Sequence, residues 1–280
     1  MQYRLSGTSM TDWHSGLYVV ATPIGNMSDL TPRAAEALRR ATVVAAEDTR
    51  TSGGLVRSTG STARLVSLTE HNVEERIPQL LPLAREGVVA LVSDAGTPAI
   101  ADPGARLVAA AHREGIPVFA VAGPSALASA LSVSGFDGPD AHFLGFLPRP
   151  KGERTELLKK ASTAASILVF FESPNRLGKT LGELAELHGD PQVVVCRELT
   201  KLHEEVVRGR ASILAGRFAT TRGECVVVVE VPPREREVES MAGLLGAMKR
   251  AGARRAAAAA EVAKLTGCRR DEAYDAWDAV

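Results

Sequence analysis

Short apolar runs alternate with helix-like segments through the first half of the chain, and this alternation restricts the fold more than any other feature. The runs LYVVATP, TVVAAED, VVALVSD and IPVFAVAG are each followed by a segment with helical signals, such as the cap Thr31 before Pro32. Strands that are apolar on both faces are typical of parallel sheets covered by helices on both sides. The sequence therefore predicts an α/β fold.

A Pro- and Gly-rich segment interrupts the alternation at residues 136–154, and we place a domain boundary near residue 135. A second series of strands and helices extends to residue 233, and the remainder indicates two or three helices with turns near Gly252 and Gly267. The predicted organisation is a flexible extension (1–16), two α/β domains (17–135 and 136–233), each on a largely parallel sheet, and a helical segment (234–280).

Composition excludes several classes of protein. Lysine and arginine total 33, as do aspartate and glutamate, so any nucleic-acid binding must use a local basic patch. The three cysteines are widely spaced and form no C-x-x-C motif, which argues against disulfides or zinc and for a reducing, cytoplasmic compartment. No apolar run approaches the roughly 20 residues of a membrane span.

Three loops stand directly after predicted strands of the first domain: ATPIGNMSDLT (21–31), SDAGTPAIADPG (93–104) and VAGPSAL (121–127). Each alone reads equally well as a tight turn or a helix cap, and none is a G-x-G-x-x-G or P-loop motif. Ligands of open α/β sheets bind at the carboxyl ends of strands, where all three loops would meet. Together they predict a ligand site built from backbone groups and small side chains.

Two basic segments are candidates for contact with the phosphates of a nucleic acid. A solvated helix face is an equally good interpretation of each segment. Aromatic residues make up only 4% of the chain, so base stacking is not the expected mode of recognition. The candidate residues are Arg149, Lys151 and Arg154 in RPKGER, and Arg254, Arg255, Arg269 and Arg270 near the C-terminus.

The motifs TPIGN, AAEDTR, SDAGTPAIADPG, GPSA, GFLPRPKGER, FFESPNRL, CRELTK and GECVVVVE follow one another in this order. In this the chain resembles the tetrapyrrole-methylase superfamily of S-adenosylmethionine enzymes, and within it the ribosomal branch. The resemblance implies a cofactor cleft between two α/β domains. The cofactor-binding positions that it implies are Pro23, Ile24, Gly25, Asp94, Gly96, Thr97, Ile100, Ser125, Ala126, Phe171, Cys196 and Glu224.

Methyl transfer to an oxygen is an in-line displacement in which alignment is the main task of the protein. The acceptor that the resemblance implies is a ribose 2′-hydroxyl, which is far less acidic than a protein side chain that ionises near pH 7. A base or a nearby cation would therefore help to remove its proton. Charged residues at strand ends are the candidates, although salt bridges between the domains would explain each of them as well. They are Asp48, Arg50, Glu172, Arg197, Glu198 and Lys201. The six histidines are scattered, and no metal site is expected.

The resemblance implies a cytoplasmic homodimer that methylates the ribose 2′-oxygen of a 16S rRNA cytidine near the decoding site, on naked rRNA or on the 30S subunit. Two alternatives remain open. A methylase of a tetrapyrrole or other small molecule would carry a different first loop, where this chain has TPIGN. A non-catalytic ribosome-binding factor would have no need to keep all three cofactor loops.

Overall fold

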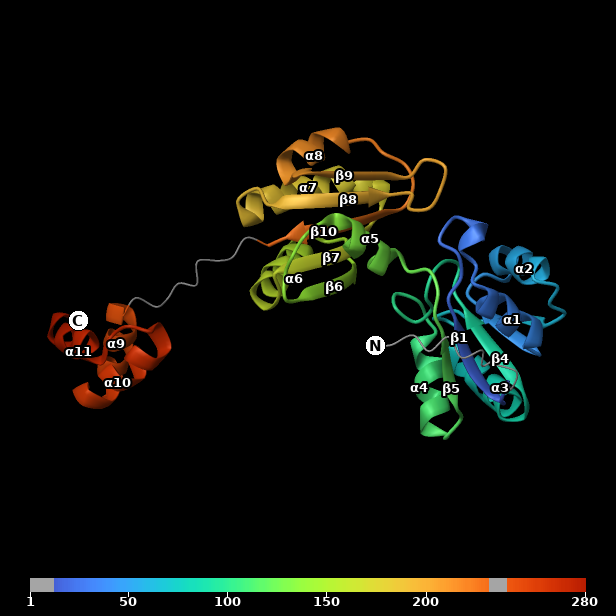
Figure 1. Ribbon diagram of the computed structural model, residues 1–280, viewed down its shortest axis with the longest axis horizontal. Helices are drawn as coiled ribbons and strands as arrows, with labels where there is room; N and C mark the ends of the chain where they lie inside the picture. Colours follow the sequence, from blue (N-terminus) through green and yellow to red (C-terminus); the bar gives the residue numbers. More distant parts are fainter. Residues whose placement is uncertain (1–12, 232–240) are drawn as a thin grey trace, which may run out of the picture. The chain divides into compact units, whose positions relative to one another are not determined.

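The computed structural model describes residues 13–231 and 241–280, and Figure 1 shows their helices and strands. The described chain separates into two compact units, one ending at Glu230 and the other beginning at Val231. Most of the predicted extension and residues 232–240 lie outside the described residues. None of the described helices is long and apolar enough to span a membrane.

The first sheet is entirely parallel, with strand order β3-β2-β4-β1-β5. Helices α1 and α2 pack on one face and α3 and α4 on the other, which confirms the predicted α/β fold (Figure 1). The strands are β1 (Gly16–Val20), β2 (Val43–Ala46), β3 (Arg64–Ser67), β4 (Val88–Val92) and β5 (Val118–Val121). The helices are α1 (Pro32–Arg40), α2 (Thr49–Ser58), α3 (Val73–Glu86), α4 (Ala105–Arg113) and α5 (Ala126–Ser134), with the 3-10 turn η1 at Met27–Asp29.

Alternate residues of the same strands build two separate cores. Leu17 and Val89 pack against α3 and α4, whereas Tyr18 and Ala90 pack against α1 and α2. The apolar runs therefore face helices on both sides. The predicted cap of α1 is confirmed, since the Thr31 hydroxyl accepts the Ala34 N–H at 3.1 Å.

The second sheet has strand order β6-β7-β10-β8-β9, and only the β6–β7 pair is parallel. Strand β10 runs antiparallel to both neighbours, and β8 and β9 form an antiparallel pair. The prediction of a largely parallel second sheet was therefore wrong. The strands are β6 (Ala141–Phe146), β7 (Ile167–Glu172), β8 (Gln192–Arg197), β9 (Glu205–Arg210) and β10 (Cys225–Glu230), and the helices are α6 (Lys151–Ala164), α7 (Pro174–His188) and α8 (Ala211–Arg217).

Helix α5 connects the two sheets. It follows β5 of the first sheet, but its residues Ala126, Leu127 and Ala130 pack in a core with β7, β8 and β10 of the second. Ile24, from the loop after β1, lies in the same core. The ends of both sheets are thereby held around one space. The predicted domain boundary near residue 135 falls at the end of α5 and stays a prediction.

The C-terminal unit is helical, as predicted. Its core is formed by Leu245, Ala258, Ala259, Val262 and Ala273. Gly252 and Gly267 adopt left-handed φ angles of 77° and 73°, and Gly267 ends α10. The helices are α9 (Met241–Arg250), α10 (Arg255–Thr266), α11 (Arg270–Asp275) and the 3-10 turn η2 (Ala276–Ala279).

Candidate functional site

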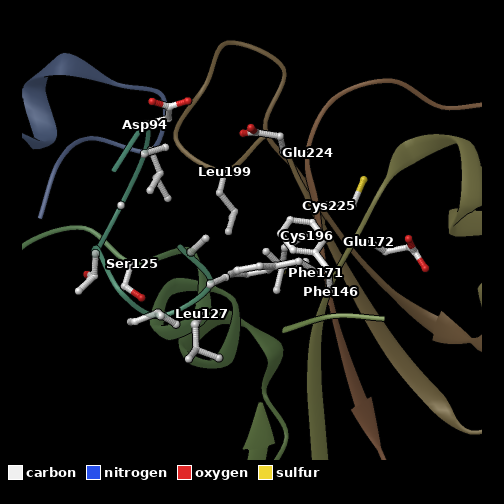
Figure 2. Close-up of a pocket in the computed structure, with 18 of the residues that line it drawn as sticks. Asp94, Ser125, Leu127, Phe146, Phe171, Glu172, Cys196, Leu199, Glu224 and Cys225 are labelled. Carbon is white, nitrogen blue, oxygen red and sulfur yellow. The ribbon is translucent and has the colours of Figure 1, made fainter. Parts of the chain in front are cut away.

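A cavity of about 400 Å³ lies where the carboxyl ends of β1, β4 and β5 meet the second sheet. Figure 2 shows Asp94 and Ser125 on one side of it and Phe171, Cys196 and Glu224 on the other. Ten of the twelve predicted cofactor positions line this cavity, all except Pro23 and Gly25. Those ten are Ile24, Asp94, Gly96, Thr97, Ile100, Ser125, Ala126, Phe171, Cys196 and Glu224.

The three predicted loops form one wall because hydrogen bonds join them. Thr22 and Gly96 exchange backbone hydrogen bonds of 2.9 and 3.0 Å, which tie the first loop to the second. The Thr97 hydroxyl donates to the Pro124 carbonyl at 3.0 Å and ties the second loop to the third. Gly96 has a φ of 78°, and a Cβ placed there would lie 3.1 Å from Ile24 Cγ2. The wall therefore requires glycine at position 96.

Ser125 serves two structural roles at once. Its hydroxyl is the N-cap of α5, where it accepts the Ala128 N–H at 3.4 Å, and the residue also lines the cavity. The helix-cap interpretation of the third loop and the ligand-site interpretation are thus compatible.

The opposite wall is largely apolar. The rings of Phe143 and Phe146 meet Phe171 edge-on, with centroids 4.9 and 5.4 Å away. Burial raises the pKa of Cys196 to about 12 and that of Cys225 to about 11, so both thiols stay protonated at neutral pH. These cysteines are lining groups rather than nucleophiles.

Asp48 and Arg50 lie outside the cavity and pair with each other. Asp48 caps α2 through the Arg50 N–H at 2.8 Å, and its carboxylate accepts two hydrogen bonds from the Arg50 guanidinium. These contacts lower the pKa of Asp48 to about 2, which makes it a weak base. The backbone N–H of Asp48 donates to Asp94 at 3.0 Å, so its link to the cavity is structural.

Glu172 is buried, and its carboxylate serves the start of α7. It accepts the Thr180 hydroxyl at 2.7 Å and the Ser173 N–H at 2.8 Å, and it pairs with Arg176 at 3.2 Å. In Figure 2 this carboxylate points away from Phe171, the preceding residue of β7. Its oxygens are occupied by partners within the protein.

Lys201 joins two carboxylates at the rim of the cavity. Its ammonium lies 2.8 Å from Glu198 and 2.8 Å from Glu224, and Glu224 lines the cavity. Burial lowers the pKa of Lys201, but the hydrogen bonds to both glutamates outweigh this effect and raise it. The hydrogen bond from Lys201 lowers the pKa of Glu198. The rim therefore carries a charged ammonium group.

Gly25 packs against Lys201 instead of lining the cavity. A Cβ at position 25 would lie 2.2 Å from Lys201 Cγ, so glycine allows the lysine stem to cross the first loop. Gly25 thus provides a contact between the two sheets, and its role in cofactor binding stays a prediction.

The sequence prediction missed several lining residues, among them Asp102, Leu127, Phe146 and Leu199. Asp102 belongs to the loop SDAGTPAIADPG, so its position after a strand was a usable signal. Burial raises the pKa of Asp102, and the nearby Asp94 charge raises it further, whereas a hydrogen bond from Ser93 opposes them. Burial also raises the pKa of Glu47, with added repulsion from Asp102, Asp94 and Glu70.

This acidic cluster predicts a pH-dependent gain from Glu47→Gln. A raised pKa means that the folded state disfavours the charged carboxylate, so at neutral pH this charge costs stability. We expect the melting temperature at pH 7 to rise by about 2–4 °C, the shift that about 1 kcal/mol gives in a chain of this size. The gain should disappear at pH 4, where Glu47 is protonated. Calorimetry at both pH values compares the melting temperatures of Glu47→Gln, the wild type and the control Asp137→Asn, which changes an exposed carboxylate. An equal gain for Glu47→Gln at pH 7 and pH 4 would contradict the prediction.

Most of the predicted RNA-binding arginines are exposed, but Arg154 is not. It is 2% exposed and forms a two-point ion pair with Glu183 at 2.7 and 2.8 Å. Its guanidinium is therefore closed to a phosphate, and its assignment to an RNA surface was wrong. Arg255 pairs with Asp278, and Arg269 pairs with Asp271 and Glu272. Lys151 pairs with Glu186 at 3.9 Å. All of the RNA-binding candidates other than Arg154 remain predictions.

Within residues 13–231 and 241–280, no group of three or more His, Cys, Asp or Glu side chains is placed to hold a metal ion.

The fold and cavity define a class of proteins, and comparisons with known proteins identify it. Residues 16–215 match the family model of the tetrapyrrole (corrin/porphyrin) methylases. A solved uroporphyrin-III C-methyltransferase from Thermus thermophilus, in complex with S-adenosylhomocysteine, covers 76% of this chain and 96% of its own at a TM-score of 0.54. Its sequence identity is 22%, so this similarity concerns the fold alone.

Two curated relatives narrow the class. The ribosomal RNA small subunit methyltransferase I of Thermotoga maritima is 47% identical over 216 residues, which cover 76% of this chain and 97% of the relative. The protein of the same name from Micromonospora olivasterospora is 42% identical and covers 97% of this chain and 90% of its own. The chain belongs to the tetrapyrrole methylases and, within them, to the ribosomal RNA small subunit methyltransferase I family. The resemblance inferred from the motifs is confirmed.

Proposed function

We propose that this protein transfers the methyl group of S-adenosylmethionine to the ribose 2′-oxygen of a cytidine in 16S rRNA near the decoding site. The observation that carries the proposal is the 47% identity to a ribosomal RNA small subunit methyltransferase I across nearly the whole of that relative. We further propose a cytoplasmic homodimer that acts on naked rRNA or the 30S subunit.

The cavity fits a cofactor of this kind. A volume of about 400 Å³ is within the range of small-molecule sites, and the mixture of apolar walls with a few polar groups is typical of them. Gly96 keeps the first wall free of a side chain, while Phe171 and Leu199 offer apolar surface opposite. Asp94 and Asp102 supply acceptors for the hydroxyl or ammonium groups of the cofactor. When bound, S-adenosylmethionine would supply a methyl group on a sulfonium sulfur, and the departing thioether is a good, neutral leaving group.

The main task of the chain in this reaction is alignment. The three loops are fixed to one another by the Thr22–Gly96 and Thr97–Pro124 hydrogen bonds, which hold the cavity wall in one shape. A fixed geometry of this kind accelerates a displacement by reducing the entropy cost of orientation. The protonated thiols of Cys196 and Cys225 offer no competing nucleophile.

Of the six predicted catalytic candidates, Glu172 lines the cavity, but its carboxylate is engaged by Ser173, Thr180 and Arg176. We therefore assign assistance in the loss of the ribose proton to Lys201 at the rim. It is one hydrogen bond away from the cavity-lining Glu224, and its ammonium stays charged. A cation at the rim stabilises negative charge that develops on an attacking oxygen. Asp48 and Arg50 lie outside the cavity, and the Glu172 carboxylate is fully engaged.

The proposal is tested with 30S subunits from cells that lack this protein. The purified protein is incubated with these subunits and labelled S-adenosylmethionine, and the rRNA is digested and mapped by mass spectrometry. We expect label on the ribose of one cytidine. Absence of label with cofactor binding intact would point to a small-molecule substrate, and absence of both would leave a non-catalytic ribosome-binding factor.

A further inference from the structure

A second, polar pocket of about 690 Å³ lies on the second sheet beside the candidate cofactor cavity. Its lining contains three arginines and one glutamate, together with hydroxyl and amide groups. The residues are Asn175, Arg197, Glu205, Arg217, Phe218, Ala219, Thr220, Thr221 and Arg222. We propose that this pocket binds a phosphate of the RNA backbone next to the nucleotide that is methylated, an inference that rests on the proposed function.

The charges in the pocket leave an excess of positive charge. Glu205 pairs with both Arg197, at 3.0 Å, and Arg217, so one carboxylate is shared by two guanidinium groups. These two hydrogen bonds lower the pKa of Glu205, which therefore stays ionised and holds both arginines in place. Arg197 is anchored further by a 3.3 Å hydrogen bond to the Arg222 carbonyl.

Arg222 supplies the free cation of the pocket. Arg222 is exposed and lines the pocket, and within the part of the chain that the structure describes no ion pair or hydrogen bond engages its guanidinium. Glu224, two residues along the chain, and Glu198 are both paired with Lys201 and form no ion pair with Arg222 in the described chain. Guanidinium groups with open donors bind phosphate oxygens through charge-assisted hydrogen bonds.

The position of the pocket matches the chemistry of a nucleotide. Ser173 and Pro174 line the cofactor cavity and Asn175 lines the second pocket. Likewise Glu224 lines the cofactor cavity and Arg222 lines the second pocket. The backbone positions of these two residues are at most about 7 Å apart, because they are two positions apart along the chain. A ribose that presents its 2′-oxygen to the first cavity carries phosphates on its 3′- and 5′-oxygens. Cys196 and Arg197, consecutive residues of β8, line the two pockets from opposite faces of the sheet. We infer that the RNA backbone passes over this edge of the sheet, which brings a phosphate next to the methylated ribose to the second pocket.

The test compares Arg222→Gln and the double variant Arg217→Gln/Arg222→Gln with the wild type. Arg197 still pairs with Glu205 in both, so the fold should be kept. The control Arg113→Gln removes an exposed charge at the end of α4, which leads to the start of β5 rather than to the cavity edge. Methylation kinetics on undermethylated 30S subunits and the salt dependence of subunit binding are measured for all four proteins.

We expect the double variant to raise the KM for subunits about ten-fold, with kcat and the KM for S-adenosylmethionine unchanged. The slope of log affinity against log salt should fall by about one for each phosphate that the variant no longer binds. Arg113→Gln should behave as the wild type. The phosphate site would be overturned if the double variant kept the subunit KM and the salt slope of the wild type, or if the control lost as much as the double variant. Either result would leave the proposed function standing. A wild-type protein that does not methylate the subunit would remove the proposed function and this inference with it.

Discussion

Gly96→Val is expected to lower methyl transfer about 100-fold or more, the loss that an ångström-scale misplacement at a reaction site can cause. Gly96 has a φ of 78°, a conformation in which β-branched residues are genuine outliers. A Cβ there meets Ile24 Cγ2 at 3.1 Å, so the added methyl groups must push against the first loop or enter the cavity. In either case the substitution disturbs both the Thr22–Gly96 hydrogen bonds and the shape of the cofactor cavity.

The matched control is Gly115→Val at the end of α4. Gly115 has a φ of 66°, and apart from its two chain neighbours no residue has an atom within 4 Å of a Cβ built on it. Both variants should therefore lose stability from backbone strain, on the order of 1–2 kcal/mol. Only Gly96→Val should also lose binding of S-adenosylmethionine in calorimetry and methyl transfer to the subunit. Equal activity of the two variants would show that the second loop does not form the cofactor site.

The first sheet could be predicted because each of its central strands is buried on both faces. Val43, Val44, Ala45 and Ala46 are all buried, so the run is apolar whichever face is considered. Strand β3 was not predicted, because it stands at the sheet edge and its RLVS sequence is partly exposed. An edge strand contacts one neighbour only, and its sequence is correspondingly less constrained.

The direction of the strands in the second sheet could not be read from the apolar runs. Strands β7, β8 and β10 are as apolar as the strands of the parallel first sheet, because most of their residues are buried under helices or next to the cavity. Their antiparallel pairing depends on β9, whose EVVRGR sequence alternates between half-buried and exposed residues and continues from β8 through a short loop. Unless β9 is recognised, no pattern in the apolar runs indicates that β10 reverses direction.

The loops of the candidate site were predictable, whereas its charged partners were not. Loop positions follow from the order of strands, which the sequence shows directly. Whether a charge faces a ligand or a neighbour depends on side-chain pairing across distant segments. Arg154 and Glu183 are 29 residues apart, and nothing in RPKGER distinguishes the buried Arg154 from the exposed Arg149.

Arg154→Ala is expected to cause a large loss of stability. Its Nε and Nη2 atoms bind the Glu183 carboxylate, and Nη1 donates to the Pro148 and Arg149 carbonyls at 2.9 and 2.8 Å. The two side chains are only 3% and 9% exposed. Removing one partner of a buried pair leaves an unpaired buried charge, which costs about 3–5 kcal/mol. At about 2–4 °C for each kcal/mol, the melting temperature should fall by about 10 °C.

Two controls separate this cost from the loss of any ion pair. Arg85→Ala breaks the Arg85–Glu114 pair, whose side chains are 56% and 49% exposed, and it should change stability by less than about 1 kcal/mol. Arg154→Met/Glu183→Leu removes both buried charges and should recover much of the stability lost in Arg154→Ala, because no unpaired carboxylate remains.

The pH dependence identifies the unpaired carboxylate as the cause. In the wild type the hydrogen bonds from Arg154 lower the pKa of Glu183, so the pair contributes stability above the ordinary glutamate range and loses it as the pH falls. In Arg154→Ala only the charges of Lys151 and Lys179 still oppose the effect of burial, so the pKa of Glu183 is higher than in the wild type, and protonation at low pH removes the buried charge. The difference in melting temperature between the two proteins should therefore be largest at pH 7 and smaller at pH 4. A difference that stays constant between these pH values would assign the cost to lost packing and the two carbonyls instead of to Glu183.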